Sequence, residues 1–265
     1  MRFRKLHATG NDFIALEARQ AEALTAAQRR SLCQRRTGIG ADGIIAVRPE
    51  GEGKLRLDYW NADGAIGSFC GNGARAALWL GYTQWGHKHA QLEAADGLHE
   101  GHILATDPPL VAVSLNLRRS PQAVAKKQWF VDTGSPHLLV EVEEDLANFP
   151  VAEKAPPLRW DTRYDPKGVN VSFFQQVEGR WHLRTYERGV EAETLSCGTA
   201  CVALSALIGT PTLEICTAGG TLRVEREGSK FWLIGEVREV FWGEWIGPYP
   251  SEMPPNPAAT RAQTA

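Results

Sequence analysis

The chain has 265 residues, of which 43% are hydrophobic and 23% are charged, as expected for a soluble globular protein of one or two domains. Its formal net charge of −2 gives no support for a nucleic-acid or membrane-surface partner, and no apolar run is long enough to span a membrane. The N-terminus lacks the apolar segment of a signal peptide and the five cysteines form no CxxC pair, so free thiols in a reducing cytoplasm are expected.

The first part of the chain predicts short strands and two helices. A helix capped by Thr25 is expected to run through Gln34. A second helix, apolar almost all round, begins after Cys70 and is expected to end at Gly81, where a left-handed cap belongs. The polar, turn-rich segment 118–123 places a domain junction near residue 118. The strands are expected at 13–16, 44–47, 55–59, 103–105 and 111–115.

The second part repeats this texture. Another apolar helix begins after Cys197 and ends at Gly209, and Pro211 supports that end. The Pro-rich, polar residues 251–265 predict a disordered tail. The strands are expected at 129–133, 138–143, 169–175, 182–186, 212–217, 221–227, 231–236 and 239–245.

The two parts look like copies of one long repeat. Gly10 and Gly134 stand at similar distances before Cys70 and Cys197, and a polar turn comes shortly before each cysteine. We therefore predict an α+β fold of two pseudo-symmetric domains, at 1–118 and 119–250. Each domain is expected to be a curved, mostly antiparallel sheet wrapped round a buried central helix. The active site would then lie in the cleft between the domains.

The repeated helix start carries the chemistry. A thiol at a helix N-terminus faces unpaired N–H groups and the positive end of the helix dipole, so we expect lowered pKa values for Cys70 and Cys197. An amino-acid carboxylate bound by both helix ends would place its Cα between two sulfurs. One thiolate could remove the Cα proton while the other thiol protonates the opposite face, without metal or cofactor. The alternative is that both cysteines are merely buried.

Other motifs favour structural roles. The segment Gly38–Gly43 matches GxGxxG, but a helix precedes it and a strand follows it, so a turn is expected instead of a dinucleotide site. The histidine pairs, at 87 and 89 and at 99 and 102, have no matching metal-ligand set and are expected in solvated loops. The other cysteines, Cys33, Cys201 and Cys216, are expected to be buried hydrophobes.

The motifs resemble those of the diaminopimelate epimerase family along nearly the whole chain. The matching segments are 10–13, 38–43, 61–64, 70–75, 134–137, 169–170, 186–189 and 193–199. The resemblance implies an isomerase that interconverts LL- and meso-2,6-diaminopimelate in lysine and peptidoglycan-precursor synthesis. It also implies a cytoplasmic homodimer with a small amino-acid substrate, no metal and no cofactor.

The same resemblance assigns roles to individual residues. Cys70 and Cys197 would be the base and the acid, with His137 and Glu187 tuning or orienting them. Glu187 would also receive an ammonium group. The substrate would be bound by Asn11, Asn61, Gly71, Asn72, Ser135, Asn170, Arg188, Gly198 and Thr199.

Departures from the family pattern leave the substrate open. The segment 190–193 is one residue longer than usual. Racemisation of another amino acid, such as histidine or proline, and a non-catalytic amino-acid-binding module are the alternatives. A guanidinium beside a carboxylate at 187–188 favours a substrate with a second amino-acid head group. The substituted positions are Gly43, Ala65, Ile66, Ser135 and Ala200.

Overall fold

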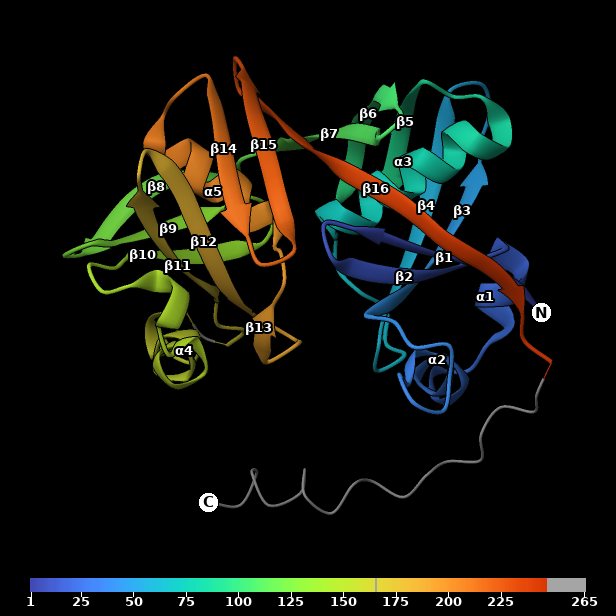
Figure 1. Ribbon diagram of the computed structural model, residues 1–265, viewed down its shortest axis with the longest axis horizontal. Coiled ribbons are helices and arrows are strands. Elements are labelled where there is room, and N and C mark those ends of the chain that lie inside the picture. The colour runs from blue at the N-terminus through green and yellow to red at the C-terminus, as the bar shows by residue number, and fades with distance from the viewer. Residues whose placement is uncertain (165, 247–265) are drawn as a thin grey trace.

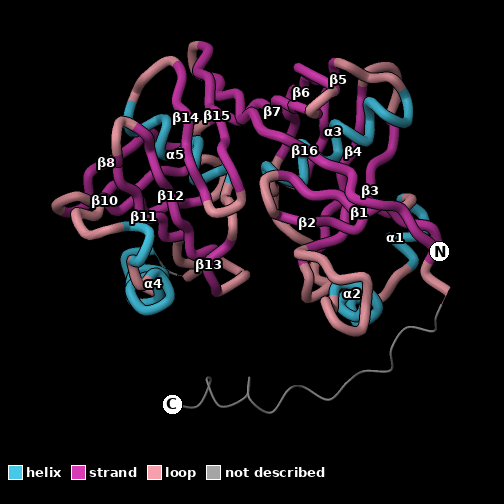
Figure 2. The backbone as a smooth tube through the Cα atoms, in the orientation of Figure 1, coloured by secondary structure: helices cyan, strands magenta, loops and turns pink. Residues whose placement is uncertain are grey.

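The computed structural model describes residues 1–164 and 166–246. Its chain forms two halves, and each half places one long helix inside a curved sheet (Figure 1). Strands dominate both halves, and the helices are few (Figure 2). The predicted α+β fold of two pseudo-symmetric domains is confirmed. The expected tail at 251–265 lies outside the described residues.

The elements alternate between the sheet and its covering segments. The helical segments are α1 (Ala18–Ala23), α2 (Ala26–Cys33), α3 (Gly71–Trp85), η1 (Leu146–Asn148), α4 (Val151–Arg159), η2 (Thr162–Tyr164) and α5 (Gly198–Ile208). The first half contributes β1 (Arg2–Ala8), β2 (Asn11–Leu16), β3 (Gly43–Pro49), β4 (Lys54–Asn61), β5 (His89–Ala94), β6 (Gly97–Thr106) and β7 (Pro109–Asn116). The remaining strands are β8 (Arg119–Ala125), β9 (Gln128–Asp132), β10 (Pro136–Glu141), β11 (Asn170–Val177), β12 (Arg180–Glu187), β13 (Ala192–Thr194), β14 (Thr212–Thr217), β15 (Gly220–Glu227) and β16 (Lys230–Glu244).

Strand pairing gives the repeat its structural form. From β1 to β7, successive pairs are antiparallel, parallel, antiparallel, parallel, antiparallel and antiparallel. The same order recurs from β9 to β16 if the short β13 is left aside. The helices α3 and α5 occupy equivalent places, each before the second strand of the second parallel pair. The repeat predicted from two cysteine motifs is therefore a repeat of whole sheets.

One strand serves both halves. The first part of β16 pairs with β15 and β7, and its second part, from Val237 onward, pairs with β1 (Figure 1). This pairing closes the first sheet round α3, since β1 and β7 would otherwise be its free edges. The domain division proposed near residue 118 remains a prediction. The end of β16 lies in the second half of the sequence but pairs with β1 of the first sheet.

The two central helices differ in where they end. The predicted cap at Gly209 is confirmed by its left-handed φ of 79°. The predicted end at Gly81 is wrong, because α3 continues to Trp85 and is capped by Gly86 at φ 76°. Gly81 is instead a packing residue, since a Cβ there would come within 2.3 Å of the Leu55 side chain.

The remaining secondary-structure expectations were met unevenly. A capping box joins Thr25 and Gln28 as predicted at the start of α2. The segment 118–123, expected to be turn-rich, instead forms most of β8. The separate strands expected at 231–236 and 239–245 are one strand, β16. Alternation is weak in these segments because β8 has no buried position and the end of β16 exposes apolar residues such as Val240 and Trp242. The elements β1, β5, β13, α1 and α4 were not predicted.

Of the four histidines expected in loops, His87 lies in the loop between α3 and β5, whereas His89, His99 and His102 lie in strands. His89 in β5 lies opposite His102 in β6, and their ring nitrogens are in contact. His99 is buried and stacks on Phe69. Its Nδ1 donates a hydrogen bond to the Ser114 carbonyl, and its Nε2 lies 2.9 Å from Asp96 Oδ1. The described part of the chain contains no helix long and apolar enough to cross a membrane.

The packing role of Gly81 is testable. Gly81→Val should reduce the free energy of unfolding by about 1–3 kcal/mol more than Gln84→Val, because only the first substitution places methyl groups against buried Leu55. Helix propensity acts in the opposite direction, because valine is a better helix former than glycine and a worse one than glutamine, and Gln84 is exposed. A larger loss at Gly81 therefore reports packing. Denaturant unfolding compares the pair. Equal losses would contradict the packing explanation.

Candidate active site

The N-termini of α3 and α5 meet at the centre of the molecule. Cys70 and Cys197 are their N-caps, and both have extended backbone angles. The glycines that follow them lie against each other, since a Cβ on Gly71 would be 3.9 Å from the Gly198 Cα. The same Cβ would lie 2.8 Å from a Leu233 methyl group, and one on Gly198 would lie 2.5 Å from it. Glycine at both positions therefore leaves room for the Leu233 side chain against the two helix ends.

A cavity of about 480 Å³ opens above these helix ends. Residues from both halves line it, so the expected cleft between the halves is present. Tyr59, Arg35 and Asp42 line the cavity but were not predicted as site residues. The predicted residues that line it are Asn11, Asn61, Cys70, Gly71, Asn72, Ser135, Asn170, Glu187, Arg188, Cys197, Gly198 and Thr199.

The departures from the family pattern fall mostly outside this cavity. Of the substituted positions, Ser135 lines it, whereas Gly43, Ala65, Ile66 and Ala200 do not. The space beside Gly43 is filled by Tyr59, because a Cβ on Gly43 would lie 2.5 Å from the tyrosine ring. The chain therefore supplies a cavity-lining phenol at this place.

The Cys70 thiol sits between a helix end and a side-chain amide. Its Sγ accepts a hydrogen bond from the Gly73 N–H at 3.4 Å and donates one to Asn11 Oδ1 at 3.6 Å. Burial raises the pKa of Cys70 to about 11, and the negative charge of Glu187 adds to this. Backbone hydrogen bonds and Arg75 pull the pKa the other way but do not cancel the burial.

The Cys197 thiol lies among groups of the second half. Burial raises its pKa well above the ordinary value, and Glu187 again contributes. The thiol lies 3.4 Å from Thr199 Oγ1. It also donates a hydrogen bond to Glu187, whose own pKa is raised by burial and lowered by hydrogen bonds from Thr194 and Cys197.

The expectation of lowered thiol pKa values is therefore wrong for both cysteines. The helix N–H groups do stabilise a thiolate, as expected, but removing the sulfurs from water costs more than these groups return. Each resting thiol has an acceptor nearby, Asn11 for Cys70 and Glu187 for Cys197. Of these two acceptors, only the glutamate can take up a proton readily.

His137 lies behind the cavity and does not line it. Its side chain is fully buried, and Nε2 lies 3.0 Å from Thr199 Oγ1. Burial lowers its pKa to about 3, and the charge of Arg188 contributes, so the imidazole is neutral near pH 7. Thr199 thus separates His137 from Cys197.

The other end of the cavity is suited to an anion. Asn170 donates to Ser135 Oγ at 2.8 Å, and its Oδ1 accepts from the backbone N–H of Arg188 at 2.9 Å. These bonds fix the loop that carries Arg188. Within the described chain, the Arg188 guanidinium makes no hydrogen bond, so its planar donor set faces the cavity unpaired.

A closed ring of hydrogen bonds joins the two halves beneath the cavity. Arg75 Nη2 donates to Thr9 Oγ1 at 3.0 Å and to the Asn72 side-chain oxygen. Asn72 Nδ2 donates to Ser196 Oγ at 3.1 Å, and Ser196 Oγ donates to the Thr9 carbonyl at 2.7 Å. We call these four residues the interdomain ring. Asn72, predicted as a carboxylate binder through its backbone, thus also positions α3 against the chain before α5.

Arg75 occupies a place made for it. The side chain is fully buried, and a Cβ on Gly235 would lie 1.7 Å from Nη1. Burial lowers the pKa of Arg75 to about 10, and its Nε and Nη1 have no partner among the described residues. Arg75 stands five residues after Cys70, within the matching segment 70–75, but the sequence alone assigned it no role.

No three His, Cys, Asp or Glu side chains gather as a metal site within residues 1–164 and 166–246. Cys33 and Cys201 are buried, in line with the structural role expected for them, whereas Cys216 is only partly buried. The Gly38–Gly43 segment forms the expected turn between α2 and β3, with Gly40 at φ 79°.

The family model described as "Diaminopimelate epimerase" matches residues 3–112 and 129–238. A diaminopimelate epimerase of Chlorobaculum tepidum is 36% identical over 88% of this chain and 97% of its own length. One of Hydrogenobaculum sp. is 33% identical over 90% of this chain and 96% of its own.

Solved structures share the fold at low identity. A hydroxyproline epimerase of Agrobacterium vitis superposes with a TM-score of 0.68 at 14% identity, covering 92% of this chain and 90% of its own. A phenazine-biosynthesis PhzF-family protein of Bacillus anthracis gives 0.70 at 14% identity, covering 93% and 99%.

The interdomain ring should contribute to stability. Ser196→Ala removes one donor and one acceptor from a buried ring and should cost about 1–3 kcal/mol of unfolding free energy. Ser205→Ala is the control, because Ser205 is equally buried and its hydroxyl has no partner in the described chain. Thermal and denaturant unfolding measure both. A Ser205→Ala loss as large as that of Ser196→Ala would contradict a role for the ring.

The raised thiol pKa values predict a pH profile. Alkylation of Cys70 by iodoacetamide should rise about tenfold per pH unit from about pH 7 to about pH 10, because the thiolate fraction grows until the pH reaches the pKa. Cys197 should react more slowly throughout. Peptide mapping by mass spectrometry follows each site. A Cys70 alkylation rate that stops rising below about pH 8 would instead show the lowered pKa expected of an exposed helix end.

Proposed function

The chain belongs to the diaminopimelate epimerase family, and from that premise we propose that it interconverts LL- and meso-2,6-diaminopimelate without a cofactor, using Cys70 and Cys197. The family makes it an isomerase acting on a small amino acid. The observation that carries the proposal is the meeting of two thiol-capped helix ends in one cavity. We extend the proposal to a cytoplasmic homodimer in lysine and peptidoglycan-precursor synthesis.

The helix ends suit the reacting carboxylate. The backbone N–H groups after Cys70 and Cys197 converge on the cavity floor, and an anion there is stabilised by both helix dipoles. When the Cα proton leaves, negative charge spreads onto this carboxylate. The same N–H groups are already in place for that charge, which lowers the barrier without reorganisation.

The protonation states of the two thiols imply a role for Glu187. Both thiols rest protonated near pH 7, so one must lose its proton before it can act as a base. Glu187 accepts a hydrogen bond from Cys197, and its raised pKa makes it a proton acceptor of suitable strength. Glu187 takes the Cys197 proton, Cys197 removes the Cα proton, and Cys70 donates its proton to the opposite face. His137, neutral behind Thr199, orients that hydroxyl and acts indirectly.

The distal half of the substrate belongs at Arg188. Its unpaired guanidinium can bind a carboxylate through two parallel hydrogen bonds, with Asn170 beside it and Asn61 also lining the cavity. A racemase for a simple monocarboxylate would leave this half-buried cation without a partner. The second head group of diaminopimelate supplies one.

The two-thiol reaction is tested with Cys70→Ser and Cys197→Ser, which keep a hydrogen-bonding atom at each helix cap. Each should lower epimerisation by at least about a hundredfold, because a serine hydroxyl is a far weaker acid than a thiol and neither ionises to a base nor donates its proton readily. In heavy water, a single variant can still exchange the Cα proton of one stereoisomer. Protein dialysed against a chelator provides the reference activity. Full turnover by either variant, or a requirement for added metal or pyridoxal phosphate, would exclude the mechanism.

The distal clamp is tested with Arg188→Lys. The ammonium cannot reproduce the guanidinium's paired hydrogen bonds, so kcat/KM for diaminopimelate should fall by about tenfold to a hundredfold. Wild-type enzyme should turn over lysine very poorly, because lysine leaves Arg188 unpaired. Steady-state kinetics on both compounds measure the effect. Comparable use of lysine and diaminopimelate by the wild type would show that Arg188 does not select a carboxylate.

A further inference from the structure

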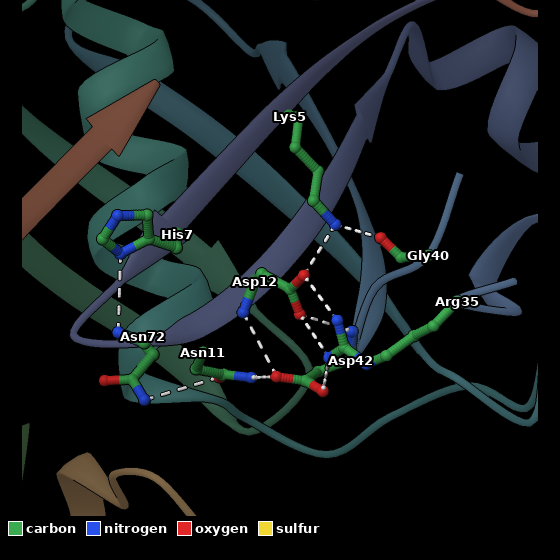
Figure 3. Close-up of polar contacts among 9 residues, drawn as sticks. Lys5, His7, Asn11, Asp12, Arg35, Gly40, Asp42 and Asn72 are labelled. Atoms are coloured by element: carbon green, nitrogen blue, oxygen red, sulfur yellow. Dashed lines mark hydrogen bonds and ion pairs between the residues drawn. The ribbon is translucent and has the colours of Figure 1, made fainter. Parts of the chain in front are cut away.

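An ion network lies beside the Cys70 thiol but does not touch it. Arg35 donates to both Asp12 oxygens, at 3.0 and 2.8 Å, and to Asp42 Oδ1 at 2.6 Å (Figure 3). Lys5 donates to Asp12 Oδ2 at 2.7 Å and also contacts the Gly40 carbonyl. We call Lys5, Asp12, Arg35 and Asp42 the Asp42 network.

The network is rigid and electrically balanced. Asp12 accepts the backbone N–H of Asp42 at 3.0 Å, and Asp42 accepts that of Asp12 at 3.2 Å. Burial alone would raise the pKa of Asp12, but hydrogen bonds from Arg35 and Lys5 lower it to about 2. Two cations thus face two carboxylates, so the network adds no net charge to the cavity. Its effect on the site must therefore come from geometry.

That geometry acts on Asn11. Asn11 Nδ2 donates to Asp42 Oδ2 at 2.8 Å, and Figure 3 shows the amide held between Asp42 and Asn72. A carboxylate can only accept hydrogen bonds, so it decides which amide atom faces it. The nitrogen must point at Asp42, and the oxygen is left facing the Cys70 thiol at 3.6 Å.

We propose that Asp42, held by Arg35, is a positioning residue that fixes Asn11 with its oxygen toward Cys70 and so keeps Cys70 as the resting proton donor. An amide oxygen accepts the S–H of a thiol but repels a thiolate. The opposite amide orientation would place a donor on the sulfur and favour the thiolate. The inference deepens the proposed function, on which it rests, because it assigns the first proton abstraction to Cys197.

Other charged and titratable groups also act on Cys70. Glu187, Arg75 and the phenol of Tyr59 are electrostatically coupled to it, and each comes from a different element from Asn11. None of them contacts Asp42 by a hydrogen bond in the described chain. The Asp42 charge itself raises the pKa of Tyr59 and of Glu187, so a variant at Asp42 needs a control that removes a nearby charge without touching Asn11.

The test is Asp42→Asn. Arg35 would retain the new amide oxygen, and the amide nitrogen would face Asn11, which must then turn its own oxygen toward residue 42. Asn11 Nδ2 would reach Cys70. The apparent pKa of Cys70 in iodoacetamide labelling should fall by about one unit, giving about tenfold faster labelling near pH 7.5. Labelling needs no turnover, so its outcome is independent of the epimerase assay.

Asp63→Asn is the matched control. Asp63 lines the same cavity and makes no hydrogen bond to Asn11, so the substitution removes the same charge without touching the amide. An unchanged Cys70 profile in Asp42→Asn would overturn the proposal. Equal shifts in both variants would overturn it too, because they would show an effect of charge alone.

Folding is monitored in the same experiment. Buried Cys33 and Cys201 label quickly only if the chain unfolds. If Asp42→Asn labels them as fast as Cys70, Asp42→Ala replaces it, because that variant also removes the acceptor for Asn11 Nδ2. A downward shift in the Cys70 profile of folded Asp42→Ala supports the proposal, and an unchanged profile contradicts it.

Discussion

The contact between the two helix N-termini is the constraint on which the site depends. Gly71 and Gly198 allow it, and Leu233 packs over both glycines from the strand that the two sheets share. Once the helix ends meet, Cys197 is buried, Cys70 is partly buried, and both sets of N–H groups face one cavity. The interdomain ring then holds this contact from below through Arg75. The anion-binding site and the burial of the sulfurs thus both result from the contact between the two helix ends.

The contact between the helix ends has two opposing effects on the pKa values of the thiols. A helix end favours the thiolate, whereas burial favours the thiol, and burial prevails for both Cys70 and Cys197. The neighbours then distinguish two otherwise equivalent sulfurs. Asn11 offers Cys70 an acceptor that cannot take a proton, whereas Glu187 offers Cys197 one that can. Pseudo-symmetry in the backbone is therefore broken by side chains where the chemistry needs two different partners.

Sequence reasoning succeeded where the signal is local. The helix starts at Cys70 and Cys197 and the cap at Gly209 follow from neighbouring residues, and so does the capping box of Thr25. It failed where the role of a residue depends on another residue far away in the sequence. Gly81 looked like a helix end, but its role depends on Leu55, which only the folded sheet brings near. The thiol pKa values and the placement of His137 likewise depend on burial, which no short motif encodes.

The long shared strand also has a consequence for how the protein is made. The first sheet is closed only when β16 lies between β1 and β7, yet β16 begins more than a hundred positions after β7 ends. At about 5–20 residues per second of synthesis, these two strand edges wait on the order of ten seconds for their partner. Unpaired edges are sites where other chains can add. The nascent first half therefore emerges as an open sheet, and its helix α3 is enclosed only after the second half has been translated.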